Sequence, residues 1–160
     1  NVKPVTVVDS ISPEDFKKDF YRTNTPVVIK TLSQNWPARE KWNWDYFKQV
    51  VGEKEVGVYN NVKSDAYTPI NKADGYMKFG EYLDMVKKGP VELRIFLFNI
   101  FHHAPQLVKD FSWPEEYMKG FVKKYPMLFV GGEGSITHMH FDIALSHILH
   151  RQKKSVAVSL

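Results

Sequence analysis

The C-terminal part of the chain, from Met127 onward, constrains the fold most strongly, because it reads as strand, glycine turn and further strands. Runs rich in β-branched and aromatic residues that are bounded by glycine clusters are typical of strands. The glycine turn is GGEGS, residues 131–135. The segments before Pro126 instead mix helical and strand periodicities. The order is therefore mixed α and β first and nearly pure β afterwards, which predicts an α+β domain.

The earlier segments divide into short elements at their glycines, prolines and capping residues. We expect strands at 5–8, 25–30, 54–59 and 91–101, with 25–30 buried. Helices are expected at 13–21, 43–51, 79–88, 105–111 and 114–124, and a loop at 60–76. A length of 160 residues fits one domain, with 1–125 as its helix and strand region and 126–160 as its first core strands.

The charge and residue usage limit the classes of function. The formal charge of +4 comes from scattered lysines and arginines between acidic residues, so nucleic-acid binding is not expected. The absence of cysteine excludes a disulfide framework, a cysteine zinc site and a thiol nucleophile. The sequence shows neither an apolar run of membrane-spanning length nor a signal-peptide pattern, so we expect a cytoplasmic protein without membrane segments.

The stretch SITHMHFD, residues 135–142, places metal-ligating side chains at alternate positions. Side chains alternate faces along a strand, so His138, His140 and Asp142 would point to one side. His140 and Asp142 would then lie about 6.6–7 Å apart along the strand, close enough to hold one cation. An imidazole and a carboxylate with one further histidine make the facial triad of non-haem Fe(II) oxygenases. By itself a His-x-Asp pattern is common.

The surrounding residues make the pattern specific. The segment GGEGSITHMHFD resembles the metal-binding turn of JmjC-type cupin oxygenases, in particular the group related to the asparaginyl hydroxylase acting on hypoxia-inducible factor. TPVVIK, NWPAREKW and ELRIFLFNIF resemble the N-terminal region of that group in the same order. The resemblance implies a double-stranded β-helix (cupin or jelly-roll) with flanking N-terminal helices. It also implies Fe(II) as cofactor, 2-oxoglutarate as co-substrate and hydroxylation of an unactivated C–H bond.

The resemblance also assigns roles to individual residues. His140 and Asp142 match the first two iron ligands, and Thr137 matches a position that hydrogen-bonds 2-oxoglutarate. A lysine on the following strand pairs with the far carboxylate in relatives, which points to Lys154, or to Lys153 if the register shifts by one residue.

The sequence also departs from the family pattern. The turn before the lysines is short. Phe96 stands where some relatives have a tyrosine that helps to hold 2-oxoglutarate, and a phenyl ring cannot donate a hydrogen bond.

The third metal ligand has no match in this sequence. The family places its second histidine on a strand several tens of residues later, so we expect the chain to be an incomplete barrel. His138 stays a candidate metal ligand, although three alternate positions on one strand are nearly collinear and facial coordination needs converging ligands. His150 is a further candidate.

A general cupin signature competes for the same segment. Gly132 followed by His138 and His140 fits its first half, in which both histidines bind the metal. That signature next requires a glutamate where Ala144 and Leu145 stand, so the His-x-Asp interpretation fits better.

The leading prediction is an Fe(II)- and 2-oxoglutarate-dependent oxygenase that hydroxylates a side chain of a protein or peptide substrate. Two alternatives stay open: a non-catalytic, truncated cupin binding module, and a metal-dependent small-molecule cupin that uses His138 and His140. An incomplete barrel would leave strand edges unpaired, so we also expect a homodimer.

Overall fold

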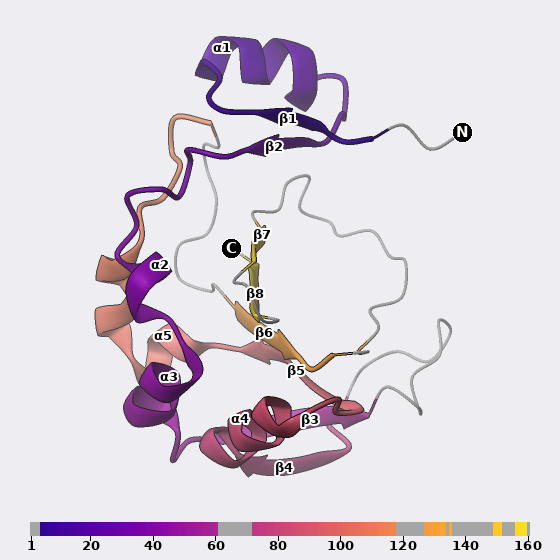
Figure 1. Cartoon of the computed structure of the whole chain (residues 1–160), viewed down its shortest axis with the longest axis vertical. Coiled ribbons are helices and arrows are strands. Elements are labelled where there is room, and N and C mark those ends of the chain that lie inside the picture. The colour runs from indigo at the N-terminus through magenta and orange to yellow at the C-terminus, as the bar shows by residue number, and fades with distance from the viewer. Residues whose placement is uncertain are drawn as a thin grey trace. The chain divides into compact units, whose positions relative to one another are not determined.

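The computed structural model describes residues 4–60, 72–117, 127–133, 135, 149–151 and 156–159, the last two ranges as backbone strands. The chain divides into two compact units. Figure 1 labels their helices and strands. Unit 1 comprises Asn1–Lys41 and Leu107–Val122, and unit 2 comprises Trp42–Gln106 and Lys123–Leu160.

Unit 1 contains a two-stranded parallel sheet and short helices. Strand β1 (Thr6–Val8) pairs with β2 (Val27–Ile29). Between them, α1 (Pro13–Asp15) continues into the π-helix η1 (Phe16–Tyr21), which confirms the predicted helix and adds a wider turn to it. The helix begins at Ser12, whose Oγ accepts a hydrogen bond from the Asp15 N–H at 3.1 Å. Helix α2 (Ala38–Lys41) is the last element of the first stretch of unit 1.

Long-range contacts join the two stretches of unit 1. The Tyr117 hydroxyl donates to the Ile11 carbonyl at 2.8 Å, and its ring meets Phe16 edge to face at 5.5 Å. Lys41 forms a 2.7 Å ion pair with Asp110, whose side chain is 4% exposed. Asp110 ends the 3₁₀-helix η3 (Pro105–Asp110), where the sequence predicted a short helix.

Unit 2 contains a six-stranded sheet with the order β4-β3-β5-β6-β8-β7, and every neighbouring pair is antiparallel. Its strands are β3 (Glu55–Asn60), β4 (Gly75–Lys78), β5 (Leu93–Phe98), β6 (Met127–Gly131), β7 (Leu149–Arg151) and β8 (Val156–Ser159). Antiparallel sheet plus helices fits the predicted α+β class. The double-stranded β-helix stays a prediction.

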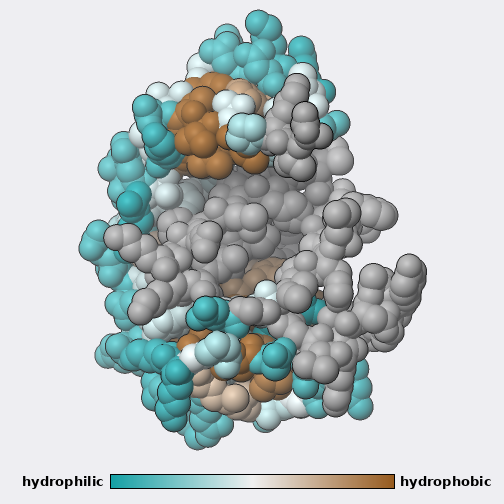
Figure 2. Space-filling view, turned by 45° about the vertical axis from the view of Figure 1, so that its right-hand side comes forward, coloured by the Kyte–Doolittle hydropathy of each residue, from teal (hydrophilic) through white to brown (hydrophobic). Residues whose placement is uncertain are grey.

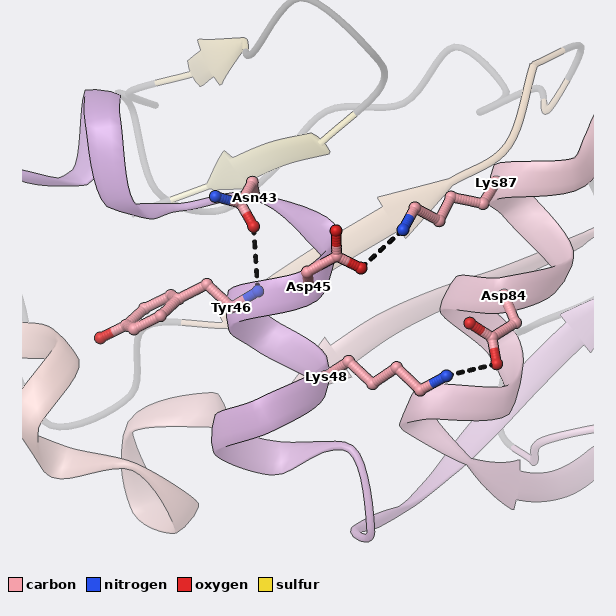
Figure 3. Close-up of polar contacts among 6 residues, drawn as sticks. All are labelled: Asn43, Asp45, Tyr46, Lys48, Asp84 and Lys87. Carbon is pink, nitrogen blue, oxygen red and sulfur yellow. Dashed lines mark hydrogen bonds and ion pairs between the residues drawn. The ribbon is translucent and has the colours of Figure 1, made fainter.

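Helices α3 (Trp44–Val51) and α4 (Phe79–Lys88) agree closely with the predicted ranges. Asn43 begins α3, because its Oδ1 accepts a hydrogen bond from the Tyr46 N–H at 2.9 Å (Figure 3). Two ion pairs join the helices: Lys48 to Asp84 at 2.6 Å and Lys87 to Asp45 at 2.5 Å (Figure 3).

The core of unit 2 lies between α4 and one face of the sheet. The Tyr82 hydroxyl lies 2.9 Å from the Leu93 carbonyl of β5 and 3.1 Å from the Val130 carbonyl of β6. The Phe79 ring lies 5.2 Å from the Phe98 ring. The sheet residues buried on this face include Val56, Val58, Ile95, Phe98, Leu128 and Val130. This packing leaves the opposite face of the strands for other contacts.

Three sequence predictions require correction. The predicted strand at 91–101 ends at Phe98, because Leu97 adopts a φ of 61° at a β-bulge and Asn99 begins helix α5 (Ile100–His103). The predicted loop at 60–76 includes the first residues of β4, and residues 61–71 lie outside the described part. The strand at 25–30 is not buried, since Val28 is 49% exposed.

Candidate active site

The predicted iron and 2-oxoglutarate residues lie outside the described part of the chain. They are Thr137, His138, His140, Asp142, Lys153 and Lys154. Their roles therefore stay predictions, and the described residues establish the strand and the turn that lead into the motif.

The glycine turn begins at the last residue of β6. A Cβ on Gly131 would lie less than 3 Å from the Ser135 Oγ, which real Cβ atoms do not tolerate. A Cβ on Gly132 would lie 3.2 Å from the Val91 backbone nitrogen, just before β5. The Ser135 N–H donates to the Gly132 carbonyl at 3.1 Å, which closes the turn. The two adjacent glycines thus allow a tight turn that ends at Ser135, two residues before Thr137.

Aromatic side chains cover the sheet next to this turn, on the face opposite the α4 core. The Phe96 ring of β5 lies 3.8 Å from the Tyr59 ring of β3 and 6.4 Å from the Phe129 ring of β6. The Arg94 guanidinium carbon lies 5.4 Å from the centre of the Phe96 ring. Phe96, expected at a tyrosine position of the family, therefore has the phenol ring of Tyr59 directly against it.

Burial raises the pKa of the Tyr59 hydroxyl, and the nearby Tyr76 and Asp74 raise it further. The phenol is therefore neutral at physiological pH and can donate a hydrogen bond. Asp74 is fixed beside β3 by two hydrogen bonds: its Oδ2 accepts from the Asn60 N–H at 2.8 Å, and its own N–H donates to the Val58 carbonyl at 3.0 Å.

The remaining predicted ligand, His150, lies in β7. The register pairs it with Val158 of β8, and Val158 pairs in turn with Leu128 of β6. Among the described residues there is no group of three or more histidine, aspartate and glutamate side chains that could hold a metal ion. The same part of the chain contains no helix long and apolar enough to cross a membrane.

Sequence reasoning missed Tyr59 as a neighbour of Phe96, and Tyr76 as a neighbour of Tyr59. The alternation in residues 54–59 was sufficient to place Tyr59 on one face of its strand with Gly57. It could not show which strand pairs with β3, and the sheet register brings these rings together.

Comparison with known proteins identifies related chains. A family model described as a cupin-like domain matches residues 13–149. The human bifunctional peptidase and (3S)-lysyl hydroxylase is 27% identical over 147 residues, which cover 82% of this chain and 46% of the human protein.

Two plant proteins match a similar extent of the chain. A lysine-specific demethylase of Arabidopsis thaliana is 30% identical over 146 residues, or 88% of this chain and 33% of the relative. An arginine-specific demethylase of the same plant is 27% identical over 147 residues, or 86% of this chain and 26% of the relative. The chain therefore spans less than half the length of each of these relatives. None of these comparisons supports the expected homodimer.

Proposed function

The chain belongs to the cupin-like domain family of JmjC type, and we propose that it carries the iron- and 2-oxoglutarate-binding strands of an oxygenase. The family match over residues 13–149 carries this proposal, because that range includes His140 and Asp142. Hydroxylases and demethylases of lysine or arginine are named among the relatives. A side chain of a protein is therefore the substrate that we propose for this chain.

Within this proposal, His140 and Asp142 hold the metal ion. One imidazole nitrogen and one carboxylate oxygen are donors that suit Fe(II), and JmjC relatives generally use that ion. Iron held by these residues would supply, with 2-oxoglutarate and dioxygen as co-substrates, the oxidising chemistry that hydroxylates a C–H bond; an N-methyl group hydroxylated in this way would leave as formaldehyde. We also propose that the chain is related to the group of JmjC-type cupin oxygenases that includes the asparaginyl hydroxylase acting on hypoxia-inducible factor.

The residues of the chain itself bind and orient the co-substrate. Thr137 offers a hydroxyl to a 2-oxoglutarate carboxylate, and Lys154 or Lys153 pairs its ammonium with the far carboxylate. The turn closed by Gly131 and Gly132 sets where the chain leaves β6 toward these residues.

Anaerobic titration of the chain with Fe(II) and 2-oxoglutarate tests the proposal. An iron chelate of a 2-oxo acid absorbs visible light, and we expect this absorption only when both components are present. His140→Ala and Asp142→Ala should abolish it, because each removes a ligand. Lys154→Ala and Lys153→Ala should weaken 2-oxoglutarate binding, the anchoring lysine more strongly. His102→Ala is the matched control, since His102 is an exposed residue of α5.

The alternatives give different results in the same titration. A small-molecule cupin that uses His138 and His140 should lose the metal in His138→Ala and keep it in Asp142→Ala. A non-catalytic module should give no 2-oxoglutarate-dependent absorption with any variant, which would contradict our proposal.

A separate measurement, the turnover of 2-oxoglutarate, tests whether this chain supplies a third metal ligand. Because no residue of this sequence matches the second histidine of the family, we expect the 160-residue chain alone to form negligible succinate from 2-oxoglutarate. Clear succinate formation would refute that expectation. Its loss in His138→Ala or in His150→Ala would then identify the completing ligand.

A further inference from the structure

A buried arginine stands among the aromatic side chains on the sheet face opposite the α4 core. Arg94 of β5 is 8% exposed, and it pairs with Tyr59 of β3 on one side and with Gly131 of β6 on the other. Paired residues of neighbouring strands point to the same face of a sheet. This face therefore carries a positive charge between a tyrosine and a position that has no side chain of its own.

The serine of the glycine turn occupies the space beside Arg94. A Cβ on Gly131 would lie less than 3 Å from the Ser135 Oγ, so this hydroxyl lies over Gly131 on the face from which Arg94 projects. The Ser135 N–H donates to the Gly132 carbonyl at 3.1 Å, which fixes the serine within the turn. The end of β6 thus places a hydroxyl next to a guanidinium, and both groups can donate hydrogen bonds.

The Arg94 guanidinium lies against an aromatic ring. Its central carbon is 5.4 Å from the centre of the Phe96 ring, which lies 3.8 Å from the Tyr59 ring and 6.4 Å from the Phe129 ring. An ion pair is stronger where apolar groups limit the screening by water. A guanidinium is always charged and has five N–H donors, so two of them can hold a carboxylate while the others contact the protein.

The glycine turn connects this pair of donors to the residues that we propose for 2-oxoglutarate. Thr137 follows Ser135 by two residues, and two residues of chain span at most about 7 Å. Phe96, against which the guanidinium lies, stands where some relatives have a tyrosine that helps to hold the co-substrate. The positive charge of Arg94 favours an anion here, and 2-oxoglutarate is the anion that the proposed function brings to this part of the chain.

We propose that Arg94 and Ser135 bind the carboxylate of 2-oxoglutarate that is remote from the metal. A 2-oxo acid chelates iron through its oxo group and the adjacent carboxylate, which leaves the remote carboxylate for side chains. The guanidinium pairs with its two oxygens, and the serine hydroxyl donates to one of them. Arg94 thereby supplies the hydrogen-bond donor that Phe96 lacks. This inference rests on the proposed function, because it concerns the co-substrate of the same domain.

Anaerobic titration of the 160-residue chain with Fe(II) and two 2-oxo acids tests the proposal. The probes are 2-oxoglutarate and 2-oxopentanoate, which has a methyl group in place of the remote carboxylate and chelates iron in the same way. We expect 2-oxoglutarate to bind more tightly. Arg94→Met should weaken 2-oxoglutarate binding about 10- to 100-fold and leave 2-oxopentanoate binding unchanged, because only 2-oxoglutarate loses an ion pair.

Further variants separate charge, geometry and folding. Arg94→Lys keeps the charge but loses the two-pronged donor, so its affinity for 2-oxoglutarate should lie between those of the unchanged chain and Arg94→Met. Ser135→Ala should weaken 2-oxoglutarate binding about two- to tenfold. Arg39→Met is the matched control, since Arg39 is an exposed arginine of α2. Unchanged binding of 2-oxopentanoate shows that a variant is folded and keeps its metal site.

Glutarate provides a measurement that needs no iron. It has both carboxylates but no oxo group, so we expect it to raise the thermal unfolding midpoint of the metal-free chain and to leave that of Arg94→Met unchanged. A chain that gives no absorption with Fe(II) and 2-oxoglutarate would contradict the proposed function, and the glutarate measurement would still decide the role of Arg94.

Three results would overturn the proposal. They are an equal weakening of both 2-oxo acids by Arg94→Met, unchanged binding of 2-oxoglutarate in Arg94→Met, and the same effect of glutarate on the unchanged chain and on Arg94→Met.

Discussion

The two units of the molecule use different interactions for their stability. In unit 2, α4 covers one face of the six-stranded sheet with large buried side chains such as Phe79, Tyr82 and Leu83. In unit 1, β1 and β2 form a parallel pair whose Val7 and Val28 are directly paired and about half exposed. Figure 2 shows a hydrophobic surface in this part of the chain. Of the largest fully buried side chains in the described residues, only Leu107 belongs to unit 1.

The difference shows which kind of contact fixes each unit. Unit 2 has more of the large fully buried side chains, whereas unit 1 combines a smaller buried group, which includes Trp36 and Phe111, with polar contacts between sequence-distant residues. The contacts of unit 1 include the Tyr117 hydrogen bond to Ile11 and the ion pair of Lys41 with Asp110. Substitutions of the same kind should therefore have unequal effects in the two units.

The largest expected effect is the loss of a core ring in unit 2. Phe79→Ala removes a fully buried ring that packs on Phe98, so we expect the free energy of unfolding to fall by about 3–5 kcal/mol. Val28→Ala in unit 1 should cost less than about 1 kcal/mol. Urea unfolding measures both changes. An equal cost would show that the valine face of β1 and β2 is covered in solution, which would contradict the comparison.

The next effect concerns the buried carboxylate of unit 1. Lys41→Met removes the cation 2.7 Å from the Asp110 carboxylate, and we expect a loss of about 1–3 kcal/mol, moderated because Lys41 is 55% exposed. Lys30→Met is the matched control, since its partner Asp9 is 81% exposed. Similar urea midpoints for the two variants would show that the Lys41–Asp110 ion pair stabilises the chain no more than the exposed Lys30–Asp9 pair.

Each unit has a tyrosine hydroxyl that donates to a backbone carbonyl distant in the sequence. Tyr82→Phe removes the one hydroxyl proton that lies within hydrogen-bond distance of both the Leu93 and Val130 carbonyls, and it should cost about 1–2 kcal/mol. Tyr117→Phe removes one hydrogen bond and keeps the contact with Phe16, so about 0.5–1.5 kcal/mol is expected.

The buried Tyr82 hydroxyl also predicts that the stability of the chain depends on pH. Burial raises the pKa of the Tyr82 hydroxyl well above its ordinary value of 10.0. The folded state therefore binds the proton more tightly than the unfolded chain, and stability should fall as the pH rises above about 10. Tyr82→Phe should remove part of this fall. Thermal unfolding between neutral and alkaline pH measures it, and an unchanged alkaline loss in Tyr82→Phe would assign it to other groups.

The smallest effect is expected from the exposed ion pairs between α3 and α4. The hydrogen bond from Lys48 lowers the pKa of the Asp84 carboxyl in the folded state. The ion pair therefore stabilises the fold above the ordinary pKa of 3.8, and this stabilisation is lost as the pH falls through the pKa that Asp84 has in the folded state. Lys48→Met should remove most of this acid dependence, because Lys87 and Lys88 also lower the pKa of Asp84. Its effect on the urea midpoint should vanish near 1 M salt, where the screening length is about 3 Å. A salt-independent effect would indicate that the lysine stem contributes by packing.

Local signals in the sequence predicted much of the fold. Helix α4 runs over the predicted residues 79–88, and Gly89 follows it with a φ of 153° that favours glycine. The helix predicted from Asn43 agrees with α3, and the structure shows that the Asn43 side chain caps it. These features depend on neighbours within four residues, which a single sequence displays directly.

The errors arose where distant contacts decide the structure. The run 91–101 is apolar throughout, yet the bulge at Leu97 and the cap at Asn99 end β5 at Phe98. The exposure of Val28 could not be read from TPVVIK, because burial depends on what packs against a strand.

The family could be predicted from the sequence, because the glycine turn and the His-x-Asp pattern at 140–142 are short local motifs, and the same motifs suggested the candidate chemistry. The sequence also determined the helices whose caps are local. Only the tertiary structure decided that Tyr59, Phe96 and Tyr76 share one face of one sheet. Cross-strand register joins residues far apart in the chain, and it is set by packing and strand pairing rather than by any neighbouring residue.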